Sequence, residues 1–118
     1  MTSKLVAAID CGTNTTRLLI TDGSGLDIRV QKITGLGRGV GASRRLSEDG
    51  IKRVEDTLSE FRELIEHHQV QSVRAVGTSA VRDALNQSTF IDAASEALNA
   101  KVEILSGDLE AKYSFLGA

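Results

Sequence analysis

Short apolar runs separated by glycine-containing turns occupy the first third of the chain. The runs are Leu5–Ile9, Arg17–Thr21 and Leu26–Ile33, and the last is rich in β-branched residues. Runs of this length, bounded by turn residues, are typical of β-strands. Asp22-Gly23 lies between the second and third runs and is a strong hairpin signal, and the gap between the first two runs is short. The pattern predicts an antiparallel meander of three strands.

The hydrophobic period changes in the middle of the chain. Apolar positions recur there at three- and four-residue spacing, which predicts a helix from Ser47 to His68 with one apolar stripe. The stripe consists of Ile51, Val54, Leu58, Phe61, Ile65 and His68. Ser47 is a suitable N-cap, and Glu48 and Asp49 place negative charge in the first turn, where the helix dipole favours it.

Strands and helices alternate in the last third of the chain. The pattern predicts strands at Ser72–Gly77 and Lys101–Leu105, a helix at Ser88–Asn99 and a final helix that begins at Ser106. Strands separated by helices return by crossover connections, so the two strands should be parallel in the sheet. We therefore expect an α/β domain with a mixed five-stranded sheet flanked by helices. The order β-β-β-α-β-α-β-α is that of a ribonuclease-H-like fold.

Composition narrows the class of protein. The 118 residues include 14 Lys and Arg against 16 Asp and Glu, and 41% are hydrophobic, which is typical of one globular domain. The net charge of −2 argues against a general nucleic-acid binder. The single cysteine, Cys11, excludes an internal disulfide and favours a reducing compartment. The first apolar run ends at Asp10, well short of the roughly 20 residues of a membrane span, so we expect a cytoplasmic protein without a membrane partner.

Polar residues that suit phosphate chemistry fill the first turn, which runs DCGTNTTR from Asp10 to Arg17. Gly12 lets a ligand approach the backbone, and the hydroxyls of Thr13 and Thr15 and nearby N–H groups can bind phosphate oxygens. Asp10 can orient a hydrated cation. The alternative is an ordinary polar turn in which Asp10 and Asn14 satisfy local backbone groups.

A second polar segment, from Gly77 to Arg82, follows the fourth predicted strand. Open α/β sheets bind ligands at the carboxyl ends of their strands. Thr78 and Ser79 offer hydroxyls there, and Arg82 offers a planar guanidinium suited to phosphate oxygens. The alternative is a plain turn in which Arg82 pairs with Asp83 on the surface, and the residues alone favour that alternative.

Four segments together resemble one protein family. They read DCGTNTTR from Asp10, LSEDGI from Leu46, GTSAVRDALN from Gly77 and LSGDLEAK from Leu105, and they span nearly the whole chain. In this order they resemble the exopolyphosphatase and guanosine pentaphosphate phosphohydrolase family (Ppx/GppA), part of the actin, sugar kinase and Hsp70 superfamily. Kinases and chaperones of the superfamily share the first loop and the fold but not the other three segments in this arrangement.

The resemblance implies a hydrolase that removes the terminal phosphate of polyphosphate or of guanosine pentaphosphate (pppGpp) by direct attack of water, without a covalent phosphoenzyme. It implies that Asp10 orients Mg²⁺ or a similar divalent cation and that Gly12–Thr15 cradles phosphates together with Thr78 and Ser79. It also implies that Arg82 contacts the phosphate chain and that Glu110 activates the attacking water. The family often has two adjacent acids at the last site, whereas Leu109 precedes Glu110 here. The alternative role for Glu110 is to stabilise the first turn of the last helix.

The same resemblance implies a partner domain. Members of the family close the active site with a second, similar domain that carries an Asp-x-Gly-Gly-Gly-Ser/Thr phosphate loop, and nothing in this chain matches that loop. We therefore expect residues 1–118 to be an N-terminal domain that works with a C-terminal domain of the same protein and is inert or nearly so alone. The apolar end at Phe115–Ala118 also favours a longer protein. The choice between polyphosphate and pppGpp and the oligomeric state, a homodimer included, stay open.

Two other functions stay open at this point. One is an ATP-dependent phosphotransferase or ATPase of the same superfamily, and the other is a non-catalytic sensor of polyphosphate or of an alarmone. A dinucleotide site is disfavoured, because the fingerprint-like glycines of Gly35–Ala42 lack the βαβ context that such a site needs. We expect that segment to be a flexible loop beside the site.

Basic residues surround this loop. They outnumber the acids there and either help to attract a polyanion or form a solvated basic face, which is the default interpretation. They are Arg29, Lys32, Arg38, Arg44, Arg45, Lys52 and Arg53. Cys11 is expected to pack as a small buried residue without a chemical role.

Overall fold

One mixed sheet organises the computed structural model, which describes residues 5–24 and 27–105. The five strands lie in the order β3-β2-β1-β4-β5. Their bounds are Val6–Cys11 for β1, Thr15–Thr21 for β2, Asp27–Ile33 for β3, Ser72–Gly77 for β4 and Val102–Ile104 for β5. Each predicted strand is present: β4 has the predicted bounds, and the other strands differ from the prediction by one or two residues at one end or both.

The directions of the strands match the sequence pattern. β1 pairs antiparallel with β2, and β2 pairs antiparallel with β3, so the predicted meander is confirmed. β4 runs parallel to β1, and β5 runs parallel to β4, as the crossover argument requires. β2 begins at Thr15, two residues before the apolar run, because Thr15 pairs with Ile33 of β3 and Thr16 pairs with Cys11 of β1.

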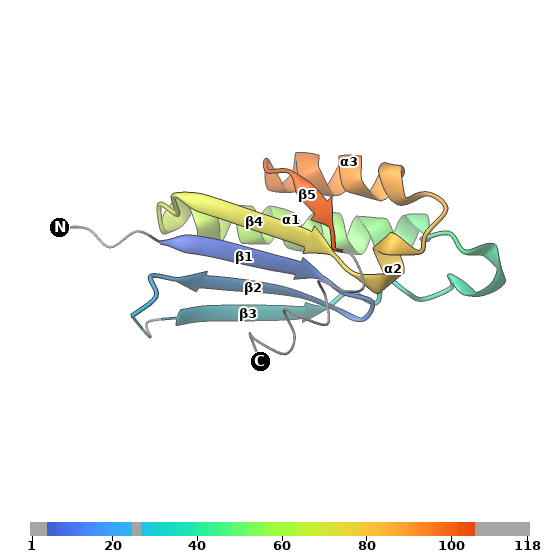
Figure 1. The fold of residues 1–118 in the computed structure, drawn as a ribbon, viewed down its shortest axis with the longest axis horizontal. Coiled ribbons are helices and arrows are strands. Elements are labelled where there is room, and N and C mark those ends of the chain that lie inside the picture. The colour runs from blue at the N-terminus through green and yellow to red at the C-terminus, as the bar shows by residue number, and fades with distance from the viewer. Residues whose placement is uncertain (1–4, 25–26, 106–118) are drawn as a thin grey trace.

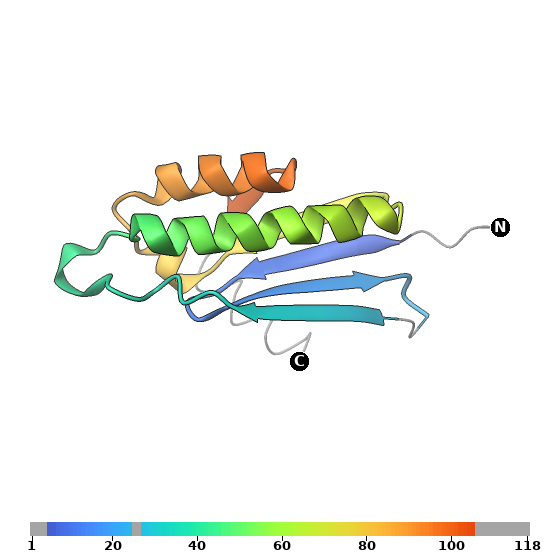
Figure 2. The same ribbon diagram turned by 180° about the vertical axis from the view of Figure 1, so that it is seen from behind.

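Two long helices cover one face of the sheet (Figures 1 and 2). They are α1, Glu48–His67, and α3, Gln87–Leu98, and both agree closely with the predicted ranges. Ser47 caps α1 as expected, since its side chain accepts a hydrogen bond of 2.9 Å from the Gly50 N–H. Two short turns were not predicted as helices: a 3₁₀ turn, η1, at Gly41–Ser43, and α2 at Ser79–Arg82.

The hydrophobic core lies between this sheet face and the two helices. Alternate residues of β1 and β2 are buried there, as period-two patterning requires. The helices contribute Ile51, Val54, Leu58, Phe61, Ile65, Phe90, Ala94 and Leu98. The final member of the predicted stripe, His68, is the half-buried C-cap of α1. The mixed sheet, its strand order and the two helices on one face confirm the expected fold class. The predicted helix from Ser106 lies outside the described residues.

The arrangement of strands gathers several loops at one end of the sheet. The β1–β2 turn, the turn that follows β4 and the long loop between β3 and α1 all lie at the end where β1 and β4 terminate (Figure 1). This is the end at which open α/β sheets bind ligands. Within the ranges that the structure describes, none of the helices has the length and hydropathy needed to cross a bilayer.

Candidate functional site

The turn between β1 and β2 is tight. Its Gly12 N–H donates a hydrogen bond of 3.0 Å to the Thr15 carbonyl oxygen, which leaves Thr13 and Asn14 at the tip. A Cβ atom on Gly12 would lie 3.0 Å from that oxygen and crowd it, whereas Thr78 Oγ1, at 3.8 Å, would be in ordinary contact. In the described ranges, no hydrogen bond uses the N–H of Thr13 or of Asn14, and both groups are therefore able to donate to a phosphate.

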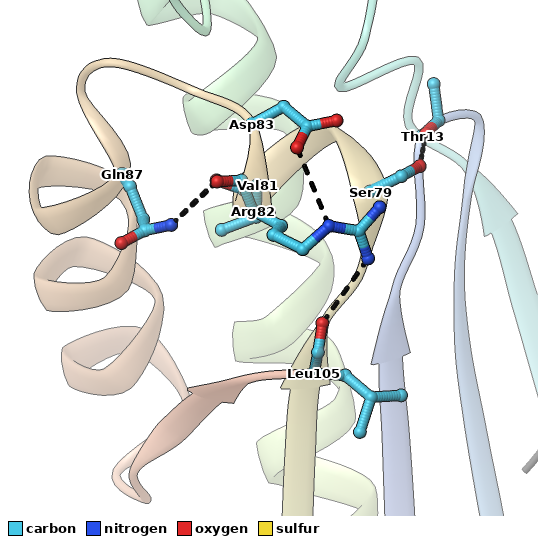
Figure 3. A network of polar contacts seen from close by, with 7 residues as sticks. All are labelled: Thr13, Ser79, Val81, Arg82, Asp83, Gln87 and Leu105. Atoms are coloured by element: carbon cyan, nitrogen blue, oxygen red, sulfur yellow. Dashed lines mark hydrogen bonds and ion pairs between the residues drawn. The ribbon is translucent and has the colours of Figure 1, made fainter. Parts of the chain in front are cut away.

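The turn after β4 lies directly against this first turn. Cys11 and Gly77 are parallel-strand partners, and the Thr78 N–H donates a hydrogen bond of 3.2 Å to the Cys11 carbonyl oxygen. The Oγ atoms of Thr13 and Ser79 are 3.1 Å apart, as Figure 3 shows. The structure therefore brings together the two segments that the sequence singled out, although 66 residues separate Thr13 from Ser79.

Helix α2 explains how Thr78 and Ser79 are held in place. Val81 is fully buried, and a Cβ atom on Gly77 would lie 3.0 Å from the Val81 side chain. A glycine at 77 therefore allows α2 to pack tightly onto the end of β4. Thr78, at the start of α2, is itself 6% exposed. Ser79 is half-buried, so its hydroxyl can still be reached from solvent.

Arg82 forms the ion pair with Asp83 that the simpler alternative predicts, and it also donates a hydrogen bond to a backbone carbonyl oxygen. Its Nε lies 3.5 Å from Asp83 Oδ1, and its NH1 donates a hydrogen bond of 3.4 Å to the Leu105 carbonyl oxygen (Figure 3). The Arg82 side chain is 30% exposed, against 66% for Asp83. These contacts hold the guanidinium between α2 and the end of β5, on the side of the sheet end where Ser79 and Thr13 lie.

Asp10 is the one site residue expected to hold a cation. It lies in β1 opposite Val76 of β4, and its Oδ1 is buried 3.9 Å from the position of a Cβ atom on Gly12. Across the described part of the chain, no three His, Cys, Asp or Glu side chains gather into a metal cage. Mg²⁺ keeps several waters and commonly binds one carboxylate together with substrate phosphates, so the carboxylate of Asp10 beside the turn predicted to bind phosphate fits that ion.

Cys11 is a core residue, as predicted. Its side chain is 0% exposed, and burial, with a smaller contribution from the nearby Asp10 charge, raises the pKa of the thiol from 9.0 to about 12. A thiol with so high a pKa is neutral at physiological pH and is not a nucleophile.

The remaining predicted site residue, Glu110, lies outside the described residues, as does most of the motif that begins at Leu105. Leu105 itself is buried and donates a hydrogen bond of 3.0 Å from its N–H to the Gly77 carbonyl oxygen. The motif therefore starts at the same sheet end as the two polar segments.

A set of contacts that the sequence does not predict holds the first turn. The N–H groups of Thr34 and Gly35 both donate to the Asn14 carbonyl oxygen at 2.9 Å, and the Gly37 N–H donates to the Thr13 carbonyl oxygen at 2.9 Å. Arg53 of α1 then binds the outer side of this loop through the carbonyl oxygens of Thr34 and Gly35, at 2.6 and 3.2 Å. The loop predicted to lie beside the site is thus attached directly to it.

The basic residues around this loop differ in their contacts. Arg53 binds backbone carbonyls, whereas three others form ion pairs: Arg29 with Asp27, Lys32 with Glu60 and Lys52 with Asp56. Arg38, Arg44 and Arg45 are exposed, and no ion pair joins them to a carboxylate of the described residues. The last three are therefore the cations of this set whose charge is not offset by an ion pair within the described residues.

Known proteins with similar sequences are phosphatases. The model of the Ppx/GppA phosphatase family matches residues 24–118. The chain is 41% identical over 126 residues to exopolyphosphatase 2 of Mycobacterium tuberculosis, covering 96% of this chain and 40% of that protein. It is 33% identical over 119 residues to the guanosine-5'-triphosphate,3'-diphosphate pyrophosphatase of Photobacterium profundum, covering 98% of this chain and 24% of that protein.

The fold is also shared with a solved structure. The crystal structure of the Aquifex aeolicus member of the Ppx/GppA family superposes with a TM-score of 0.87 at 34% sequence identity. The match covers 97% of this chain and 39% of that one. The chain therefore spans less than half the length of each of these relatives.

Proposed function

Because this chain belongs to the Ppx/GppA phosphatase family, we propose that it is the N-terminal domain of a phosphohydrolase. The substrate is inorganic polyphosphate or pppGpp, and the enzyme removes its terminal phosphate. The two relatives named above are an exopolyphosphatase and a pyrophosphatase of a guanosine phosphate, which supports both substrates.

The meeting of two polar turns at one sheet end carries this proposal. The Thr78 N–H to Cys11 carbonyl bond and the 3.1 Å approach of Thr13 to Ser79 gather hydroxyls and backbone N–H groups in one place. Phosphoryl transfer depends mainly on positioning the phosphate and neutralising its charge, and such a set of donors suits that task. An ordinary polar turn would not need a second hydroxyl-bearing segment against it.

The proposed reaction needs one base and several donors from this chain. Glu110 orients a water molecule, whose oxygen attacks the terminal phosphorus while the bond from that phosphorus to the bridging oxygen breaks. The water's proton passes to Glu110, and the shortened phosphate chain leaves with the bridging oxygen. The donors of Gly12–Thr15 and of Thr78–Arg82 bind the phosphate oxygens and stabilise the charge that shifts onto the leaving group.

A divalent cation, Mg²⁺ or a similar ion, completes the set of groups that we propose. Asp10 is the residue that would hold it, through a carboxylate beside the phosphate-binding turn. When bound, such a cation neutralises charge on the phosphate oxygens.

We further propose that a C-terminal domain of the same protein supplies the other side of the active site. The chain spans 40% and 24% of the two relatives by length, and it carries no second phosphate loop. The 118 residues alone should therefore release little or no phosphate.

A cytoplasmic location is part of the proposal, because a buried free thiol fits a reducing compartment.

The test is phosphate release by the full-length gene product with Mg²⁺. Long-chain polyphosphate, pppGpp and ATP are offered in parallel, and Glu110→Gln is compared with Glu103→Gln. Glu103 is a matched control because it is an exposed glutamate of β5, which forms a surface ion pair of 4.0 Å with Arg74. Loss of a general base typically costs about 10²- to 10⁴-fold in rate, so Glu110→Gln should lose that much while Glu103→Gln retains full activity.

The outcomes separate the three functions. Release from polyphosphate or pppGpp that depends on Glu110 supports the proposal and identifies the substrate. Activity on ATP alone would favour the phosphotransferase or ATPase. Tight binding without release would favour a sensor.

A further inference from the structure

Three backbone hydrogen bonds attach the segment Thr34–Gly37 to the phosphate-binding turn. Two of them meet at the Asn14 carbonyl oxygen, and the third joins the Gly37 N–H to the Thr13 carbonyl oxygen at 2.9 Å. A buried bond of 2.8 Å between the hydroxyls of Thr16 and Thr34 adds a side-chain contact close by. The segment is therefore the surface against which the turn rests.

Gly37 packs closely against Thr13 of the turn. A Cβ atom there would overlap Thr13 Cγ2, closer than real Cβ atoms come to any atom, but it would lie 3.5 Å from the Thr13 carbonyl oxygen, which is ordinary contact. Gly37 is not among the glycines with a left-handed φ, so its backbone conformation would accept alanine. Glycine at 37 is thus required by the methyl group of Thr13, not by the conformation of the loop.

The methyl and hydroxyl groups of Thr13 cannot move independently. Both are attached to the same Cβ, and branching at that atom makes χ1 stiff. A rotation that carried Cγ2 away from a new Cβ at position 37 would also carry Oγ1 away from Ser79 Oγ, now 3.1 Å distant. The contact at Gly37 therefore sets the direction of the Thr13 hydroxyl.

We infer that Gly37 is a positioning residue of the phosphate site, which acts through Thr13 by leaving room for the Thr13 methyl group. The inference rests on the proposed function, because it assigns the Thr13 hydroxyl to phosphate binding. Gly37 lies in none of the four segments that resemble the family, and its part in the site comes from the contacts alone.

A double-mutant cycle in the full-length protein tests the inference. Gly37→Ala, Thr13→Ser and the double variant are compared with the unmodified protein in phosphate release from polyphosphate and pppGpp. Thr13→Ser removes Cγ2 and keeps the hydroxyl. A misplacement of about 1 Å at an active site can cost on the order of 10²-fold in rate. We therefore expect Gly37→Ala to lower kcat/KM by roughly 10- to 100-fold in the otherwise unmodified protein. In the Thr13→Ser background, the same substitution should lower kcat/KM by less than about twofold.

A structural readout accompanies the kinetics. Crystal structures of the variants should show the Thr13 hydroxyl beyond hydrogen-bond reach of Ser79 in Gly37→Ala and the hydroxyl at 13 back within reach in the double variant. Ile65→Val, a small truncation of the core near the far end of α1, is the control for lost stability and should leave kcat/KM unchanged.

Equal losses from Gly37→Ala in both backgrounds would overturn the inference, and so would no loss in either. If Gly37→Ala alone does not fold, the comparison of Thr13→Ser with the double variant decides, because the inference requires these two to be equally active. If even the unmodified protein releases no phosphate, the proposed function fails. The crystal structures then decide separately whether Gly37 directs the hydroxyl of Thr13.

Discussion

The hydroxyl oxygens of Thr13 and Ser79 lie 3.1 Å apart, although the two residues come from different turns and are 66 positions apart in the chain. Parallel pairing of β1 with β4 produces this contact, because it aligns Cys11 with Gly77 and so places the following residues side by side. The donors that we propose to bind phosphate therefore depend on the sheet as much as on the turns themselves.

Because the two hydroxyls are neighbours, the effects of removing them on kcat/KM should not be additive. In the full-length protein, we expect Thr13→Ala and Ser79→Ala each to lower kcat/KM about tenfold, the equivalent of one lost hydrogen bond of about 1.4 kcal/mol. The double variant should lose clearly less than the product of the two single losses. Ser59→Ala, at an exposed position of α1, is the control and should behave as the unmodified protein. Independent, multiplying losses would show that the two turns act separately.

Arg82 allows its two interpretations to be separated by experiment. An ion pair between partly exposed groups contributes about 0–1 kcal/mol, so if pairing with Asp83 were its whole role, Arg82→Gln and Asp83→Asn would have similarly small effects. If Arg82 binds phosphate, Arg82→Gln should lower kcat/KM on the order of 10²-fold, and Asp83→Asn should not. Steady-state kinetics of both variants with either substrate distinguishes the two. Equal, small effects of the two substitutions would mean that Arg82 forms only a surface ion pair and does not bind phosphate.

Much of the fold could be predicted because turn residues bound its short apolar runs and its longest helix has a clear period. The runs correspond to β1 and β2, and the stripe from Ile51 to Ile65 corresponds to the buried face of α1. Helix α2 could not be predicted in this way, because four residues are too few to show a helical period. It depends on the contact between Gly77 and Val81, which is a property of packing.

The candidate site was predictable only in part, for a related reason. The hydroxyls and charges at Asp10, Thr13 and Arg82 are visible as residue types. The attachment of the turn to Thr34–Gly37 uses backbone N–H and carbonyl groups. Every residue except proline carries both groups, so the residue types in the sequence do not indicate this attachment. In the sequence, Arg53 looks like one more basic surface residue, because its charge is visible there and its carbonyl partners are not.

The Cys11 thiol should be inert over the pH range in which ordinary thiols react. Its pKa is raised to about 12, so the reactive thiolate is scarce in the native protein even at pH 9. Iodoacetamide labelling of the full-length protein, followed by peptide mapping, should leave Cys11 unmodified at pH 7 and pH 9 and modify it after denaturation. Rapid native labelling at pH 9 would contradict the burial.

The same shift predicts a pH dependence of stability. The native pKa lies above the ordinary value of 9.0, so the contribution of the neutral thiol is complete below pH 9 and is lost as the pH rises towards 12. The free energy of unfolding should therefore fall more steeply above pH 9 in the unmodified protein than in Cys11→Ala, as followed by denaturant titration. Parallel curves for the two proteins would argue against the shift.

Removal of the cation should abolish phosphate release, and Asp10 should set how much cation is needed. Chelation by EDTA is expected to stop the reaction, and added Mg²⁺ to restore it. Asp10→Asn keeps the shape of the side chain but removes the charge that Mg²⁺ favours, so the half-saturating Mg²⁺ concentration should rise about tenfold or more. Asp92→Asn, at an exposed position of α3, is the matched control. An unchanged Mg²⁺ dependence in Asp10→Asn would remove Asp10 from the cation site.

The basic residues of the long loop should affect long substrates in particular. Arg44 and Arg45 are exposed, and their loop is tied to the segment after α2 by a bond of 2.8 Å from the Leu85 N–H to the Arg44 carbonyl oxygen. The backbone that carries these two side chains is therefore held against the segment that follows α2. A long polyphosphate extends past the reacting phosphate and can reach these charges, whereas pppGpp offers fewer phosphates.

We expect Arg44→Gln with Arg45→Gln to raise KM for long-chain polyphosphate several-fold at low salt, with kcat and the KM for pppGpp unchanged. Ionic screening shortens the range of such attraction to about 10 Å at 0.1 M salt and about 3 Å at 1 M, so the difference should fade as salt is added. Arg29→Gln with Lys52→Gln is the matched control, because both of those cations already have acidic partners. A loss that is equal for both substrates, or that persists at high salt, would mean that these arginines support the loop and do not recruit the chain of phosphates.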